Sequence, residues 1–179
     1  MRLLALPRPE PRHRRVIRLR VLGIDPGSHK TGWGIVDAAG SRMTHVASGT
    51  VTAVGSTLSL RLVSIADALD EIVSKYRPVA CSVETIFHAK NSQSALKLGH
   101  ARGVALLCAA RAELAVFEYT AGQIKQACTG QGRAEKGQVQ TMVRMILGLD
   151  AMGFDTSDAL AAAICHHAFA DSPLLMARS

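Results

Sequence analysis

The alternation of apolar and polar residues predicts a sheet that begins with three consecutive strands. Residues 19–25 form a short apolar strand, a glycine-rich turn follows, and two more strand-like segments cover 31–36 and 42–54. Short turns connect these three segments, which is typical of a meander. This part of the chain is therefore expected to form the antiparallel part of a sheet.

The rest of the chain alternates between helical and strand patterns. Apolar residues at helical spacing predict a long helix over 58–76, which ends before Pro78. There follow a strand over 79–84, a helix over 92–112, a strand over 115–119, a polar basic stretch, and helices near 135–147 and 155–169. We therefore predict an α/β fold with a mixed central sheet, an antiparallel meander plus parallel strands, flanked by helices.

The length of 179 residues and the 48% hydrophobic content suffice for one compact domain but not for two. We expect this domain to cover 19–170, with a C-terminal tail over 171–179. Residues 1–18 combine three prolines with scattered arginines and lack an apolar period. They are interpreted as a flexible Arg/Pro-rich arm or as the product of a mis-assigned start.

Cysteine spacing and hydropathy bear on the cellular location. The four cysteines are scattered and form no Cys-x-x-Cys pair, which is typical of reduced thiols rather than of a zinc site. The longest apolar stretch, 104–110, is too short to span a bilayer, and Pro7 interrupts the apolar start of the chain. The sequence predicts a soluble, cytoplasmic protein that does not contact membranes.

The net charge of +7 suggests a polyanionic partner, but its distribution is uneven. Residues 75–144 contain ten basic and four acidic residues, whereas 21–74 and 145–179 are both net acidic. The middle third is therefore the candidate binding surface for nucleic acid.

Four acidic residues are the candidate catalytic groups and metal ligands. Asp25 and Glu84 each end a buried strand, where a carboxylate is costly without a cation or a hydrogen-bond donor. Asp155 and Asp158 lie three apart, on one face of a helix. Two hard cations such as Mg²⁺ require several converging carboxylates, so the pattern predicts a two-metal phosphodiester hydrolase in which Asp25 bridges the ions.

Each of these acids also has an ordinary structural interpretation. Asp25 precedes Pro26 and could start a turn, and Glu84 could be an exposed residue of an edge strand. Asp155 or Ser157 could be a helix N-cap. The joint occurrence of all four acids favours the metal site, and the glycines at 27, 32 and 34 would let a phosphate backbone approach it closely.

The segments that carry these acids resemble the RuvC-type Holliday junction resolvases. The resemblance runs from about residue 21 to 169, and its most specific segments are Gly-Ile-Asp-Pro-Gly-Ser (23–28), Phe-His-Ala-Lys-Asn-Ser-Gln-Ser-Ala-Leu-Lys-Leu-Gly-His-Ala-Arg-Gly (87–103), Ile-Lys-Gln (124–126), Ala-Glu-Lys (134–136) and Asp-Thr-Ser-Asp-Ala-Leu-Ala (155–161). Each segment alone could arise by chance. Their occurrence in this order identifies the family.

The resemblance implies an RNase H-like fold and a homodimer that makes paired symmetrical incisions in four-way (Holliday) DNA junctions. These incisions leave ligatable 5′-phosphate and 3′-hydroxyl nicks in recombination and DNA repair. The resemblance places Asp25, Glu84, Asp155 and Asp158 at the metal, with two Mg²⁺ per active site or Mn²⁺ as a substitute. It also implies cooperation with a RuvA–RuvB branch-migration complex.

The resemblance assigns Lys125 and Lys136 to phosphate contact and transition-state charge, with Lys136 among the catalytic residues. It assigns Phe87 to stacking on a base near the crossover. The composition of the same region agrees, because an aromatic residue beside several basic and amide side chains suits unstacked DNA. The expected DNA contacts are Phe87, Lys90, Asn91, Lys97, Arg102, Lys125, Arg133 and Lys136.

Three rival interpretations remain open from the sequence. The segment from Gly23 to Gly32 also resembles the phosphate loop of an actin-like or sugar-kinase domain, although 179 residues leave no room for the second lobe of such proteins. A YqgF-type nuclease of the RNase H-like class is the second alternative. The third is a junction-binding protein without catalysis, which the presence of all four acids disfavours.

Overall fold

The computed structural model describes residues 18–85 and 92–170. Its strands are β1 (Leu19–Asp25), β2 (Lys30–Ala39), β3 (Arg42–Thr52), β4 (Ala80–Glu84) and β5 (Ala115–Tyr119). They form one sheet in the order β3-β2-β1-β4-β5, with antiparallel pairing from β1 to β3 and parallel pairing of β1 with β4 and of β4 with β5. The predicted mixed sheet, a meander followed by parallel strands, is confirmed.

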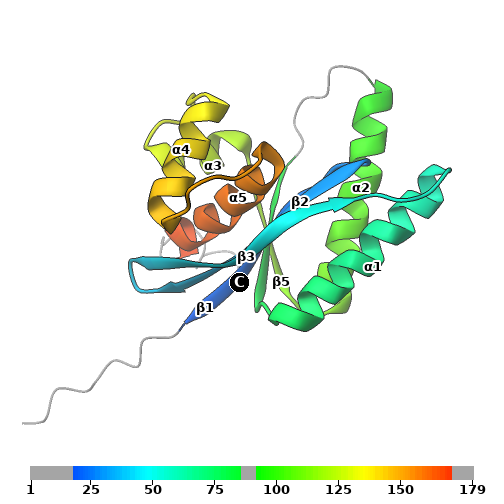
Figure 1. Cartoon of the computed structure of the whole chain (residues 1–179), viewed down its shortest axis with the longest axis horizontal. Helices are drawn as coiled ribbons and strands as arrows, with labels where there is room; N and C mark the ends of the chain where they lie inside the picture. Colours follow the sequence, from blue (N-terminus) through cyan, green and yellow to red (C-terminus); the bar gives the residue numbers. More distant parts are fainter. Residues whose placement is uncertain (1–17, 86–91, 171–179) are drawn as a thin grey trace, which may run out of the picture.

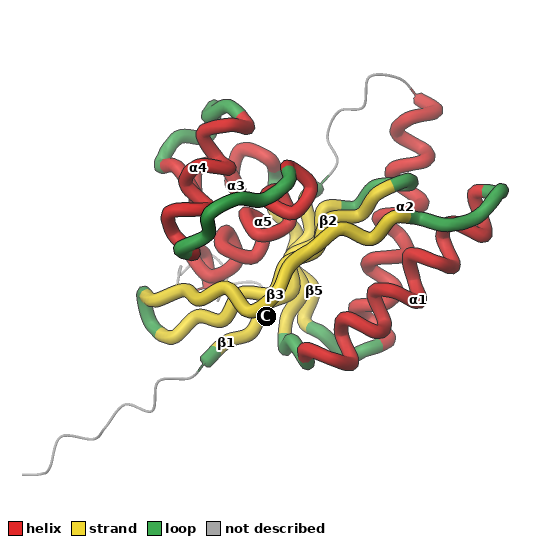
Figure 2. The backbone as a smooth tube through the Cα atoms, viewed as in Figure 1, coloured by secondary structure: helices red, strands yellow, loops and turns green. Residues whose placement is uncertain are grey.

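Helices cover both faces of this sheet. They are α1 (Leu58–Tyr76), α2 (Ser92–Arg111), α3 (Ala121–Thr129), α4 (Lys136–Leu147) and α5 (Phe154–Ala170). Helices α1 and α2 lie on one side of the sheet and α3, α4 and α5 on the other (Figures 1 and 2). No helix within the described residues is long and apolar enough to cross a bilayer.

The alternation of side chains along β1 divides the core between these two faces. Val21 packs in the cluster that includes α3, α4 and α5, whereas Leu22 and Ile24 pack against α1 and α2. Because side chains alternate along a strand, Asp25 shares a face with Val21. The same alternation in β4 places Glu84 on the face of Ser82, whose hydroxyl donates a hydrogen bond to the Ala162 carbonyl of α5.

Helix α5 packs so closely on β1 and β2 that glycine is needed beneath it. A β-carbon at Gly32 would lie 2.1 Å from the Asp155 carbonyl oxygen, and one at Gly23 would lie 1.9 Å from that of Ala159. From the sequence, Gly32 and Gly34 were predicted to let a phosphate backbone approach closely. The structure shows instead that both face α5, since a β-carbon at Gly34 would meet the Leu160 side chain.

Helix α3 was not predicted from the sequence, where its residues form part of a polar basic stretch. Only Ile124 and Cys128 are buried in this helix, so its apolar pattern is too short to be recognised by periodicity. Its boundaries carry the clearer signal. Thr120 and Gln123 form a capping box at the start, and Gly130 ends the helix with a positive φ of 75°.

Candidate active site

Asp25 and Glu84 end neighbouring strands at the same edge of the sheet. The parallel register of β1 and β4 pairs Ile24 with Val83. The next residue in each strand is the acid, so Asp25 and Glu84 lie next to each other. Both lie on the face that α5 covers. The prediction that these two acids project from the ends of buried strands is confirmed, and Glu84 does not lie on an edge strand, because β4 is between β1 and β5.

Asp155 and Asp158 lie in the first two turns of α5, which begins at Phe154. Asp155 is therefore inside the helix rather than its N-cap, and the same holds for Ser157. The close packing of α5 on Gly32 brings this end of the helix to the strand pair in which Gly32 lies opposite Asp25. The fold thus gathers all four acids from three separate segments.

The pKa of Asp25 shows that the other three acids lie close to it. The pKa of Asp25 is raised to about 7, first by burial and then by the charges of Asp158, Glu84 and Asp155, against the opposing charge of Lys136. The pKa of Glu84 is also raised, first by burial and then by Asp158. Such a group of mutually repelling carboxylates is typical of a site that binds cations.

Two lysines from the other helices of this face balance part of the charge. Lys136, the first residue of α4, donates a hydrogen bond from Nζ to Asp158 Oδ2 at 2.7 Å. This bond is the main reason why the pKa of Lys136 is raised. Lys125 on α3 lowers the pKa of Glu84 through its charge. The sequence prediction that both lysines lie at the acidic site therefore agrees with their positions.

The four acids offer a suitable set of donors for a divalent cation, although they are not yet converged around one point. Among residues 18–85 and 92–170, no three His, Cys, Asp or Glu side chains are arranged so that they could hold a metal ion as they stand. Oxygen donors are what Mg²⁺ and Mn²⁺ prefer. Only Oδ2 of Asp158 is bonded to Lys136, and the other carboxylate oxygens of the four acids are the groups that would hold a cation.

Apart from Lys125 and Lys136, which lie at the acidic site, the expected DNA contacts fall into three groups. Phe87, Lys90 and Asn91 lie outside the described residues. Lys97 and Arg133 are exposed, and each is free to reach a phosphate. Arg102, in contrast, forms an ion pair with Glu118 and is largely covered.

Two residues near this site, Glu118 and Phe154, were not predicted from the sequence to have a role. Glu118 precedes Tyr119 at the end of β5 and holds Arg102, and its polar side chain in an otherwise apolar strand is the only sequence signal. Phe154 immediately precedes Asp155, and its side chain is 52% exposed. An aromatic residue at the start of a helix next to two acids is only a weak sequence signal.

A mixed sheet with acids at the ends of β1 and β4 and a covering helix that carries two more acids defines the RNase H-like class of proteins. The fold of the yeast mitochondrial Holliday junction resolvase Ydc2 agrees, with a TM-score of 0.57 at 14% identity over 84% of this chain and 77% of that one. The family model described as "Crossover junction endodeoxyribonuclease RuvC" matches residues 21–166, and the chain belongs to this family.

Individual relatives support this family membership. A crossover junction endodeoxyribonuclease RuvC of Syntrophotalea carbinolica is 51% identical over 160 residues, which cover 88% of this chain and 99% of the relative. The structure titled "T. thermophilus RuvC in complex with Holliday junction substrate" superposes with a TM-score of 0.80 at 33% identity, over 85% of this chain and 94% of that one. The resemblance deduced from the sequence segments is confirmed.

Proposed function

We propose that this protein is a metal-dependent endonuclease that resolves four-way DNA junctions by paired, symmetrical incision. The observation that carries the proposal is the gathering of Asp25, Glu84, Asp155 and Asp158 at one edge of the sheet, where burial and the neighbouring acids raise the pKa of Asp25. The junction as substrate is supported by the relative from T. thermophilus, whose structure contains a Holliday junction. The products would be nicks with 5′-phosphate and 3′-hydroxyl ends.

The four acids are the proposed ligands for two Mg²⁺ ions, or for Mn²⁺ in their place. Bound divalent cations supply an activated water and stabilise the leaving 3′ oxygen in this class of hydrolysis. Asp25 is the proposed bridging ligand, because it is the acid on which the charges of all the others act. Lys136, which donates to Asp158 Oδ2 beside these acids, is the proposed contact to the scissile phosphate.

The proposed DNA surface extends from the acidic site over the basic side chains of α2, α3 and α4. Lys125 and Lys136 are next to the acids, and Lys97 and Arg133 offer exposed charges for the phosphates farther along. Phe87, Lys90 and Asn91 stay proposed contacts on the strength of the family resemblance alone. These residues would position the junction, with Phe87 stacking on an unpaired base.

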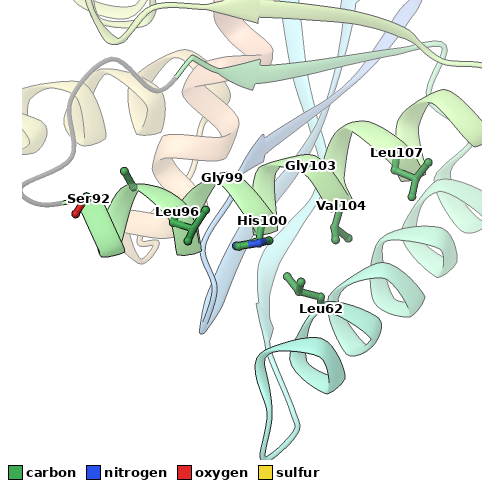
Figure 3. A pocket seen from close by; sticks show the side chains of 9 residues that line it. Leu62, Ser92, Leu96, Gly99, His100, Gly103, Val104 and Leu107 are labelled. Carbon is green, nitrogen blue, oxygen red and sulfur yellow. The ribbon is translucent and has the colours of Figure 1, made fainter.

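We also propose that the protein is a homodimer assembled through α2. An apolar groove runs along this helix, lined by Leu96, Gly99, Gly103 and Leu107 from α2 and by Leu62 from α1 (Figure 3). Leu96 and Leu107 are each more than half exposed. A β-carbon at Gly99 or Gly103 would meet no atom within 4 Å, so the packing of the described chain does not require glycine there.

Two glycines four residues apart allow a second helix to approach closely, which favours a copy of α2 as the occupant of this groove. A two-fold axis through α2 would present two acidic sites to the two equivalent strands of a junction. The nuclease domain proposed for 19–170 would form this dimer, with 1–18 as an arm and 171–179 as a tail. Cooperation with a RuvA–RuvB complex, which rests on the family resemblance, and a cytoplasmic location, which rests on the scattered cysteines and the short apolar stretches, complete the proposal.

The experiment that tests the activity uses a labelled, mobile four-way junction with and without Mg²⁺ or Mn²⁺. Symmetrical, ligatable nicks that require both the metal and Asp25 would support the proposal. The matched control is Asp150→Asn, because Asp150 is an exposed acid outside the cluster and its substitution should leave cleavage intact. Binding without incision would contradict the enzymatic part, and absence of binding would favour the nucleotide-binding alternative.

Sedimentation velocity tests the dimer. Leu107→Glu places a charge in the apolar groove and should convert a dimer into monomers. Met145→Glu is the control, since Met145 on α4 is equally apolar and 71% exposed but lies outside the groove. A monomeric wild-type protein, or a dimer that survives the change at Leu107, would overturn the assignment of the interface to α2.

A further inference from the structure

We propose that Arg102 is a positioning residue for Glu84 rather than a contact to DNA. The inference rests on the proposed nuclease function, in which Glu84 is a metal ligand. Its observational basis is that the Arg102 guanidinium is engaged by two parts of the protein. Nη2 lies 2.7 Å from Glu118 Oε2 on β5, and Nε donates a long hydrogen bond of 3.4 Å to the Glu84 carbonyl oxygen at the end of β4.

These contacts place one side chain of α2 across the ends of two parallel strands. Glu84 pairs with Tyr119 in the register of β4 and β5, and Val83 pairs with Glu118. Just beyond Glu84, the Thr85 amide donates a hydrogen bond of 2.8 Å to the Tyr119 carbonyl. Arg102 therefore contacts the backbone of the last residue of β4, the same residue whose side chain carries the proposed ligand carboxylate.

The surroundings of Arg102 disfavour a phosphate contact. Its side chain is only 20% exposed, and its charge is already paired with that of Glu118. A phosphate would have to compete with this carboxylate for the same guanidinium. Lys97, more than one turn earlier on α2, is exposed and in a better position to bind DNA.

Arginine is suited to this role because its planar group donates in two fixed directions at once. One direction holds β5 through Glu118, and the other holds the backbone that carries Glu84. A lysine at this position would keep the charge but could not maintain both contacts in the same geometry. Arg102 and Glu118 thus connect α2 to the backbone of Glu84, a proposed metal ligand.

Three variants separate positioning from DNA contact: Arg102→Ala, Arg102→Lys and Glu118→Gln. If Arg102 positions Glu84, single-turnover cleavage should fall about 10- to 100-fold in Arg102→Ala, with a similar loss of Mn²⁺ affinity measured by EPR titration without DNA. Arg102→Lys should lose most of the same rate, and Glu118→Gln should lose part of it. Metal-free junction binding should keep its affinity and its salt dependence in all three.

A phosphate contact predicts the opposite pattern. Arg102→Ala would then weaken metal-free junction binding and reduce the slope of log K against log salt by about 0.9, whereas Arg102→Lys would largely retain binding. Glu118→Gln would strengthen binding, because it removes a competing anion. That pattern, or unchanged Mn²⁺ affinity in Arg102→Ala, would overturn the proposal.

Two further comparisons make the test specific. Arg111→Ala is the matched control, because Arg111 is an exposed arginine at the other end of α2 and its loss should change none of these measurements. In the double variant Arg102→Ala/Glu118→Ala, the rate should fall no further than in Arg102→Ala, because the pair acts as a unit. If the wild-type protein cleaves no junction, the proposed function fails, while Mn²⁺ affinity and salt dependence still decide the role of Arg102.

Discussion

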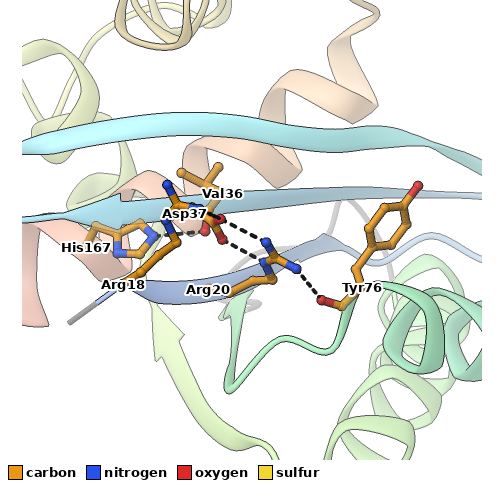
Figure 4. Close-up of polar contacts among 6 residues, drawn as sticks. All are labelled: Arg18, Arg20, Val36, Asp37, Tyr76 and His167. Carbon is orange, nitrogen blue, oxygen red and sulfur yellow. Dashed lines mark hydrogen bonds and ion pairs between the residues drawn. The ribbon is translucent and has the colours of Figure 1, made fainter. Parts of the chain in front are cut away.

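Asp25 and Asp37 lie at opposite ends of the same antiparallel strand pair, but Asp37 is paired with an arginine whereas Asp25 is surrounded by other acids. Asp37 on β2 is 5% exposed and lies opposite Arg20 of β1, which donates to both carboxylate oxygens, from Nε at 2.7 Å and from a terminal nitrogen at 2.9 Å. Arg20 also donates to the Tyr76 carbonyl, which ties this end of the sheet to α1 (Figure 4). Asp25, on the same sheet, has three acids as neighbours.

The pKa values of the two acids differ in the same way. Hydrogen bonding by Arg20 holds the pKa of Asp37 below its ordinary value, and Arg18 adds to the effect. Burial and neighbouring carboxylates raise the pKa of Asp25 to about 7. A buried acid with its own arginine stabilises the fold, whereas a group of partly buried acids with too few cations lowers stability and offers a binding site for an added cation.

The largest expected effect is on catalysis at the acidic end. Asp25→Asn should reduce metal-dependent junction cleavage by about three orders of magnitude or more, because a metal supplies several kcal/mol to the transition state. The same change should raise the melting temperature of the metal-free protein, since it removes one of four repelling charges. Cleavage assays and calorimetry measure the two effects, and a destabilised Asp25→Asn protein would contradict the comparison.

The opposite acid should affect stability and not chemistry. Asp37→Asn should lower the free energy of unfolding by about 2 kcal/mol, which is less than the loss for a fully buried pair because the Arg20 side chain is 32% exposed. Junction cleavage per folded molecule should be unchanged. Urea denaturation of wild type and Asp37→Asn measures the difference in the free energy of unfolding. Reduced cleavage by fully folded Asp37→Asn protein would contradict the assignment of stability to this end of the sheet and of catalysis to the other.

The contribution of Asp37 should also depend on pH. Because the folded state lowers the pKa of Asp37, the stabilisation is fully present above its unfolded pKa of about 4 and is lost as the pH falls through the folded value. The difference in stability between wild type and Asp37→Asn should therefore be greatest near pH 7 and shrink below about pH 4. A difference that grows in acid would show that Arg20 does not stabilise the ionised carboxylate.

Much of the fold and of the acidic site was predictable because it depends on short-range patterns. Asp25 and Glu84 were found because each ends an apolar strand, and the three-residue spacing placed Asp155 and Asp158 on one helical face. Strand alternation and helix periodicity are local properties of the sequence, so they can be recognised without knowing how the elements pack.

The contacts between distant elements were not predictable in the same way. The pair formed by Arg102 and Glu118 depends on how α2 lies against β5, which no spacing in the sequence specifies. The need for glycine at Gly23 and Gly32 depends likewise on how deeply α5 packs on the sheet. Helix α3 was missed because two buried residues are too few to establish a period.

The smallest expected effect concerns Ser157, which lies between Asp155 and Asp158. Its hydroxyl is buried and has no hydrogen-bond partner among the described residues, a further sign that the acidic end is not optimised for stability. Ser157→Ala should therefore raise the free energy of unfolding by about 1 kcal/mol, because it removes an unsatisfied polar group. Thr156→Ala is the control, since the Thr156 hydroxyl lies 3.4 Å from that of Thr50 and its loss should bring no gain. Equal stability of wild type and Ser157→Ala in thermal melts would show that the hydroxyl is satisfied in solution, and the contrast between the two ends would then rest on the carboxylates alone.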